Sequence, residues 1–120
     1  MSTTQTIKSA KDIVLSFIDA LNREDFAAAR QQLADDFNFV GVMGSRHGAD
    51  IYLDDMSRMK FKYDIKKVLA DDSDVSLFYD IDMGNATTIF ASGWYQIQSG
   101  KIKAFKVIFD PRPLLEKQSS

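Results

Sequence analysis

Two neighbouring carboxylates, Asp35 and Asp36, are the first residues in the chain whose type and spacing could do chemistry. They stand in the segment LADDFNFVG, where apolar residues at helical spacing give way to apolar residues at every second position. A pair of carboxylates can act as acid and base. Short acids at such a junction also stabilise turns through hydrogen bonds to the backbone. We favour the second interpretation, in which the two acids end a helix and open a strand.

His47 is the only histidine, the residue type that most often moves protons near neutral pH. It lies in the segment GSRHGAD, with Asp50 close behind it. In a catalytic interpretation His47 is the base and Asp50 is the neighbour that orients it. In the alternative interpretation His47 is an exposed loop residue, and the lack of a second metal ligand or nucleophile nearby favours this one.

Asp80 and Asp82 occupy alternate positions of a predicted strand, so their carboxylates share one face. The other face is strongly apolar, which predicts that both acids point outward. The segment DIDMGN also lacks the third acid and the distant glutamate of a calcium loop. We therefore predict no metal site and no cofactor.

The composition limits the partners and the compartment. The net charge of -2 and the pI near 5.3 offer no long-range attraction for nucleic acid or for an anionic membrane. The segment SRMKFKYDIKK mixes basic and aromatic residues, but its pattern is that of a solvated strand. The chain has no cysteine, no apolar signal core in MSTTQTIKSA and no apolar run of the ~20 residues that a membrane span needs. We expect a cytoplasmic protein with no nucleic-acid or membrane partner.

The periodicity predicts helices first and then an antiparallel meander. At 120 residues with 45% hydrophobic residues, the chain should form one domain, residues 9–115, with polar tails at 1–8 and 116–120. Helices that precede a run of strands are typical of an α+β domain in which helices cover one face of a sheet. Helices are predicted at about 10–21, 26–34 and 49–59, and strands at about 37–42, 61–69, 75–83, 86–98 and 101–109.

Several segments resemble a known superfamily. FIDALNREDFAAARQQLADDFNFVG, the later GADIY and the closing YQIQSGKIKAFKVIFDP resemble NTF2-like proteins, close to the SnoaL-like and ketosteroid-isomerase-like branches. The resemblance covers roughly residues 10–115. It implies a cone, in which a strongly curved, mostly antiparallel sheet wraps around three N-terminal helices and leaves a deep apolar pocket. Members of this superfamily include enzymes and non-catalytic binding domains, so the fold leaves the chemistry open.

The resemblance also places the catalytic positions of the ketosteroid isomerase branch. The tyrosine that donates a proton to the oxyanion falls on Phe17, and the general-base aspartate falls on Gly41. The protonated acid falls near Ala91 or Gly93. None of these side chains can move a proton, so the resemblance implies no isomerase activity of the steroid type.

The inward positions of the superfamily predict an aromatic pocket with tyrosine hydroxyls as its polar groups. These hydroxyls either bind a ligand oxygen or bond to each other, to the backbone or to water. We expect Gly41 to enlarge the floor of the pocket. The predicted ligand-binding residues are Phe17, Phe39, Gly41, Tyr63, Tyr79, Tyr95, Phe105 and Phe109, with Phe37 and Val107 also facing inward.

The convex face of the last strands should carry an apolar strip that a monomer seldom exposes. The resemblance favours pairing through the sheet, so we predict a homodimer with twofold symmetry and Trp94 near its centre. The strip comprises Phe78, Phe90, Trp94, Ile102, Ala104 and Ile108.

The preferred functional hypothesis is a SnoaL-like domain that binds a small, largely apolar molecule without steroid isomerisation. The alternative is a lyase, cyclase, isomerase or hydrolase in which His47, Asp50 and Tyr79 move protons. A protein that only dimerises or recruits another protein would have a collapsed pocket.

Overall fold

The computed structural model describes residues 9–42, 44–84 and 86–112. The predicted tails 1–8 and 116–120 lie outside these ranges. The elements, in chain order, are α1 (Ala10–Asn22), α2 (Phe26–Gln31), β1 (Leu33–Val40), β2 (Ser45–His47), α3 (Ala49–Met59), β3 (Lys62–Ala70), β4 (Asp74–Gly84), β5 (Thr87–Gln98) and β6 (Lys101–Phe109).

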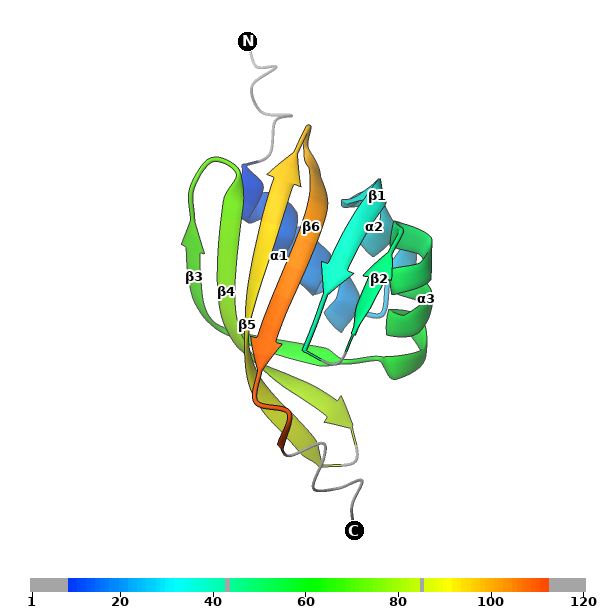
Figure 1. The fold of residues 1–120 in the computed structure, drawn as a ribbon, viewed down its shortest axis with the longest axis vertical. Coiled ribbons are helices and arrows are strands. Elements are labelled where there is room, and N and C mark those ends of the chain that lie inside the picture. Colours follow the sequence, from blue (N-terminus) through cyan, green and yellow to red (C-terminus); the bar gives the residue numbers. More distant parts are fainter. Residues whose placement is uncertain (1–8, 43, 85, 113–120) are drawn as a thin grey trace.

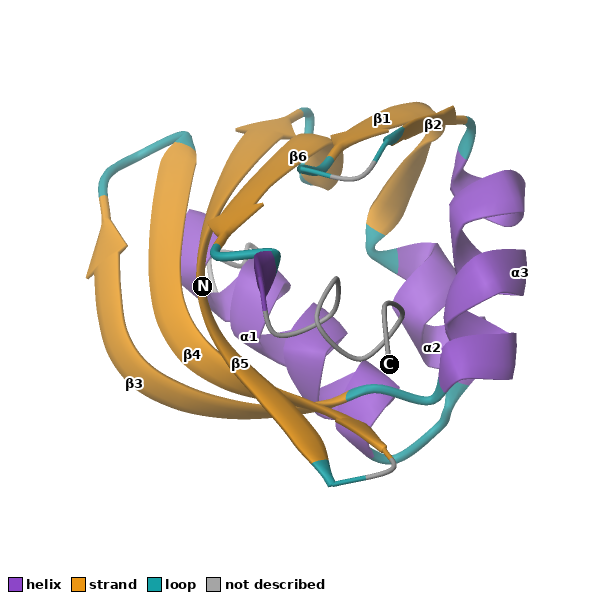
Figure 2. Cartoon of the chain, turned by 60° about the horizontal axis from the view of Figure 1, so that its bottom comes forward, coloured by secondary structure: helices purple, strands orange, loops and turns teal. Residues whose placement is uncertain are grey.

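The strands form one sheet in the order β2-β1-β6-β5-β4-β3 (Figure 1). β1 and β6 run parallel, and the other neighbouring pairs are antiparallel. Figure 2 shows the sheet bending strongly around α1, with α3 beside β1 and β2 and α2 between α1 and α3. The prediction of an α+β cone with a curved, mostly antiparallel sheet is confirmed.

The first two helices begin at the predicted residues, and each has a side-chain cap at its N-terminus. The Ser9 Oγ accepts a hydrogen bond of 3.1 Å from the backbone N of Asp12, and the Asp25 Oδ1 accepts one of 3.1 Å from Ala28 N. Each bond satisfies an N–H group that has no partner within its helix. The apolar face of α1 is fully buried and consists of Ile13, Val14, Phe17, Ile18 and Leu21.

The junction after α2 differs from the prediction, because the helix ends at Gln31 and β1 already begins at Leu33. Within β1, the register with β6 shifts between Leu33 and Asn38. Asp35 and Asp36 lie in this irregular stretch, where Asp35 pairs with Arg30 at 2.7 Å and Asp36 pairs with Lys103. The two acids therefore lie inside the first strand and pair with basic side chains, whereas the structural interpretation had placed them at a turn held by backbone hydrogen bonds.

A bulge in β6 reverses the facing of one predicted surface residue. Gln96 pairs with Ala104 and Ile97 pairs with Ile102, so Lys103 has no direct partner on β5. Side chains alternate along a strand, and one extra residue turns the following positions over. Ile102 is consequently buried in the core, and its predicted place on the convex face was wrong.

The segment around Ser45–His47, predicted as a loop, forms the short edge strand β2. It pairs antiparallel with the end of β1. Among the described residues, no helix is both long and apolar enough to cross a membrane.

Gly93 lies in the middle of β5, where two aromatic side chains cross the inner face of the sheet. A Cβ at this position would lie 2.5 Å from the Tyr79 hydroxyl and 2.7 Å from the Phe105 ring. Both distances are shorter than van der Waals contact, so any larger residue must displace an aromatic ring.

We expect Gly93→Ala to lower the free energy of unfolding by about 1–3 kcal/mol, the usual cost of adding a methyl group to a filled core. Ser92→Ala is the control, because Ser92 is the neighbouring residue and lies on the other face of β5. It should change stability by less than about 0.5 kcal/mol. Urea unfolding followed by circular dichroism measures both values, and equal stability of the two variants would contradict the packing described here.

Candidate functional site

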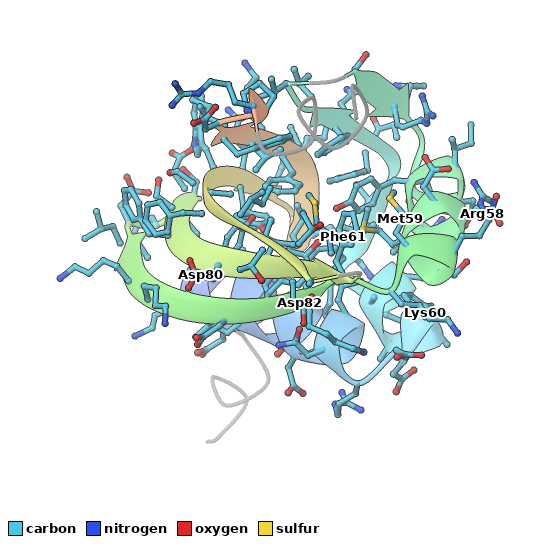
Figure 3. All side chains as sticks on the ribbon, turned by 90° about the horizontal axis from the view of Figure 1, so that it is seen from below. Arg58, Met59, Lys60, Phe61, Asp80 and Asp82 are labelled. Carbon is cyan, nitrogen blue, oxygen red and sulfur yellow. The ribbon has the colours of Figure 1, made fainter. Side chains whose placement is uncertain are left out.

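A cavity of about 430 Å³ lies between the inner face of the sheet and α3. Met59 and Phe61 line it where α3 leads into β3, whereas their neighbours Arg58 and Lys60 point away (Figure 3). The wall is mainly aromatic and aliphatic. It is built from Phe39, Gly41, Val42, Gly44, Ser45, Arg46, Tyr52, Asp55, Met56, Met59, Phe61, Tyr63, Tyr79, Ile81, Met83, Ile89, Phe105, Val107 and Phe109.

Strand alternation in the sequence correctly predicted that most of the strand residues of this wall face the inside of the sheet. The predicted residues in the wall are Phe39, Gly41, Tyr63, Tyr79, Phe105 and Phe109. Phe17 and Tyr95 lie deeper, packed edge to face with ring centres 6.5 Å apart. The Phe105 ring stacks on Tyr95 at 4.1 Å and covers it. Tyr95 therefore belongs to the core behind the cavity wall.

Gly41 does not enlarge the cavity in the way that its missing side chain suggests. A Cβ at Gly41 would lie 2.8 Å from the ring of Phe39. The Phe39 ring occupies that space and packs against Tyr52 and Phe105, with ring centres 5.0 and 5.4 Å away. The cavity floor is thus aromatic at this point.

The tyrosine hydroxyls provide the neutral polar groups of the cavity. The Tyr79 and Tyr95 hydroxyls share a hydrogen bond of 2.8 Å, and the Tyr63 hydroxyl donates to the Met56 sulfur at 3.8 Å. Burial raises the pKa of Tyr52, Tyr63, Tyr79 and Tyr95 above the ordinary tyrosine value. These phenols therefore stay protonated, and Tyr52, Tyr63 and Tyr79 lie in the cavity wall, whereas Tyr95 is behind it.

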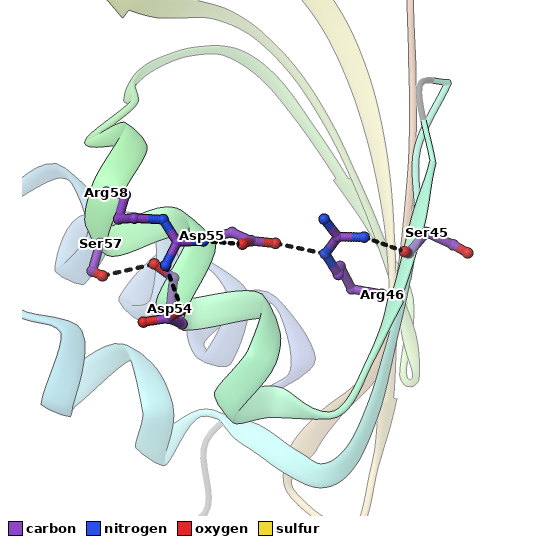
Figure 4. A network of polar contacts seen from close by, with 6 residues as sticks. All are labelled: Ser45, Arg46, Asp54, Asp55, Ser57 and Arg58. Atoms are coloured by element: carbon purple, nitrogen blue, oxygen red, sulfur yellow. Dashed lines mark hydrogen bonds and ion pairs between the residues drawn. The ribbon is translucent and has the colours of Figure 1, made fainter.

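Sequence reasoning missed an ion pair in the cavity wall. Arg46 on β2 reaches across to Asp55 on α3, with 2.7 Å between its Nε and the Asp55 Oδ2 (Figure 4). The other carboxylate oxygen of Asp55 accepts a hydrogen bond of 2.6 Å from Arg58. A usable signal was present: Tyr52, Asp55 and Met56 are spaced by three and four residues and so share one helix face.

His47 and Asp50 do not come together at the cavity. The exposed His47 ring contacts the side chain of Asn38, on the face of β1 and β2 opposite to Phe39 and Arg46. Asp50 is exposed and accepts a hydrogen bond of 2.7 Å from Arg30. Strand alternation explains the position of His47. The side chain of its neighbour Arg46 points toward the cavity, so the His47 side chain points to the opposite face.

Asp80 and Asp82 lie outside the cavity wall (Figure 3). Asp80 lies 3.7 Å from Lys66, and the Asp82 carboxylate accepts a hydrogen bond from Gly84 N. Within the described ranges, no three acids or histidines gather closely enough to hold a metal ion.

The curved sheet, the helices packed into it and the cavity between them define the NTF2-like class of proteins. A family model described as a SnoaL-like domain matches residues 14–105. The chain therefore belongs to the SnoaL-like family.

Three solved structures illustrate the range of similar proteins. An NTF2-like protein of unknown function from Cytophaga hutchinsonii ATCC 33406 is 48% identical, covers 89% of this chain and 95% of its own, and has a TM-score of 0.86. An LEH-like epoxide hydrolase of M. tuberculosis is 23% identical, with coverages of 89% and 86% and a TM-score of 0.78. TerC, crystallised with polyporic acid, is 14% identical, with coverages of 92% and 98% and a TM-score of 0.79. Among curated proteins, none matches the chain.

The raised tyrosine pKa values predict how stability depends on alkaline pH. An exposed tyrosine in the unfolded chain titrates near pH 10, whereas the folded protein holds its four tyrosines protonated to higher pH. The contribution of these tyrosines to the free energy of unfolding should therefore be fully present below about pH 10 and fall as the pH rises further, because the unfolded state loses protons first.

Absorbance at 295 nm reports tyrosine ionisation, and circular dichroism reports folding. We expect the two transitions to coincide above about pH 10. A tyrosine that titrates near pH 10 while the circular dichroism spectrum stays native would contradict the burial described above.

Proposed function

We propose that this protein binds a small, largely apolar organic molecule in the cavity between α3 and the sheet. The observation that carries the proposal is an aromatic and aliphatic cavity of about 430 Å³. This volume is within the range of small-molecule sites, which combine an apolar wall with a few polar groups. TerC provides a precedent on the same fold, since it was crystallised with a small organic acid. We keep a cytoplasmic location as a prediction from the cysteine-free sequence.

The same proposal leaves out ketosteroid isomerase activity. Of the positions that the resemblance assigns to that chemistry, Phe17 is buried behind the cavity wall. At Gly41 and Gly93, aromatic rings occupy the space that a catalytic side chain would need. These contacts support a cavity without the groups of steroid isomerisation.

Asp55 supports a second candidate function, catalysis by a different set of groups. It is the one carboxylate in the described cavity wall, and Tyr79 lies in the same wall. In this alternative Asp55 moves the proton, the role that the sequence suggested for His47 and Asp50. Conversion of a bound compound by the wild-type protein but not by Asp55→Asn, followed by mass spectrometry, would favour it.

The binding proposal is tested with N-phenyl-1-naphthylamine, a neutral probe that fluoresces in apolar sites. We expect the wild-type protein to bind it and Met59→Trp to weaken binding by about tenfold or more, because the indole would fill the rim of the cavity. Met59 is 44% exposed, so the larger side chain can be accommodated without unfolding the core.

Ile51→Trp is the matched control, because Ile51 lies on the same helix, is 56% exposed and does not line the cavity. It should bind the probe as the wild-type protein does. Equal binding by both variants would place the probe elsewhere. A wild-type protein that binds neither this probe nor other neutral apolar compounds would overturn the proposed function.

We also propose that the protein forms a homodimer through the convex face of the sheet. Phe90, Trp94 and Ile108 are exposed on this face, and the rings of Phe78 and Phe90 stack with centres 6.4 Å apart. The Trp94 indole donates a hydrogen bond of 2.9 Å to Asp74, which fixes its orientation. Exposed apolar residues grouped in this way are typical of protein interfaces.

Ile108→Glu tests the dimer, because Ile108 is 71% exposed and its replacement should cost the folded monomer little. We expect a dimeric mass for the wild-type protein in sedimentation experiments at micromolar concentration and a monomeric mass for the variant. Ile51→Glu adds the same charge on α3 and should leave the dimer intact. A monomeric wild-type protein would refute the proposal.

A further inference from the structure

The charged groups of the cavity wall are confined to one place. Of the described residues that line the cavity, only Arg46 and Asp55 carry a charge. Their ion pair joins β2 to α3 in the wall of the cavity. Within the described wall, a charged group of a ligand could therefore form an ion pair only at this place.

The two partners are not equally available to a ligand. The Asp55 side chain is 17% exposed, and each of its oxygens already accepts a hydrogen bond from a guanidinium. The Arg46 side chain is 51% exposed and uses its Nε for Asp55 and its Nη1 for the backbone oxygen of Ser45. Its Nη2 donates to none of the described residues, so part of the guanidinium is free to bind.

The Arg46–Asp55 contact can be exchanged without leaving a buried charge unpaired. If an incoming anion draws Arg46 away, Asp55 keeps Arg58 at 2.6 Å (Figure 4). Leaving one partner of an ion pair without its counter-charge is the main cost of breaking such a pair. Arg58, which lies outside the cavity wall, removes that cost.

We infer that the ligands of this cavity are amphipathic organic anions. The apolar body packs among the aromatic rings, and a carboxylate or a comparable anionic oxygen group pairs with Arg46 at the rim. This inference rests on the proposed binding function and specifies the ligand class. Arginine suits the task, because its planar guanidinium donates several hydrogen bonds to a carboxylate at once.

The experiment compares 1-naphthylacetate with its methyl ester by isothermal titration calorimetry at neutral pH. The two compounds share the apolar ring and differ in charge. We expect the wild-type protein to bind the carboxylate about tenfold more tightly, as for a charge-assisted hydrogen bond. In Arg46→Met this preference should disappear, so that the acid and the ester bind with about equal affinity.

Two further variants separate the role of Arg46 from general charge effects. Lys60→Met removes an exposed cation that does not line the cavity and should keep the tenfold preference. Arg58→Met should reduce it, because Asp55 then depends on Arg46 alone. Circular dichroism confirms that each variant is folded.

The outcomes distinguish this inference from the function on which it rests. Equal binding of the acid and the ester by the wild-type protein, or a preference that survives in Arg46→Met, would overturn the anionic ligand class and leave the binding function standing. Binding of neither compound, together with no binding of neutral apolar probes, would overturn both.

Discussion

The contact of Tyr79 and Phe105 over Gly93 is the constraint on which the interior of this protein depends. Because Gly93 has no side chain, both rings approach the backbone of β5. Phe105 then stacks on Tyr95 and reaches Phe39, so the aromatic residues form a continuous layer from β5 to β1. This layer separates the closed core around α1 from the open cavity below α3. The cavity therefore has a closely packed aromatic wall on the sheet side.

The side of the cavity opposite the sheet is formed by a helix. Tyr52, Asp55, Met56 and Met59 come from one helix, and only the first three are buried or nearly so. Arg46 joins this helix to the edge of the sheet. A ligand would thus rest its apolar body against the aromatic layer and meet the half-exposed Arg46 at the edge of the sheet. A half-exposed cation stays hydrated until a ligand covers it, which avoids the large cost of burying it in the empty protein.

Much of this arrangement could be predicted from the sequence, because strand alternation is a strong local signal. The long strands β3 to β6 and their inward residues Tyr63, Tyr79 and Phe105 follow from it directly. The prediction for Ile102 was wrong because the bulge at Lys103 depends on how β6 pairs with β1 and β5 together, which no single segment encodes. A bulge of this kind is visible only once the strand neighbours are known.

The helix residues of the site were harder to predict for a related reason. Their spacing shows that Tyr52 and Asp55 share a face, but the sequence does not say whether that face meets the core, the cavity or water. His47 was a reasonable candidate by residue type, and the one-residue step from Arg46 to His47 decided which of the two faces inward. The direction in which such polar side chains point depends on tertiary packing, and the sequence alone does not determine it.

The place of β6 in the sheet has a consequence for how the chain reaches its native state. Among the described strands, β6 comes last in the chain, yet it lies between β1 and β5 and joins the two parts of the sheet. Until residues 101–109 emerge from the ribosome, β1 has no partner on the side away from β2, and the hairpins of β3, β4 and β5 form alone. Native folding must wait for this long-range pairing, and contacts between distant segments form slowly. A nascent chain that stops short of β6 would expose two open sheet edges, the feature that most readily leads to aggregation.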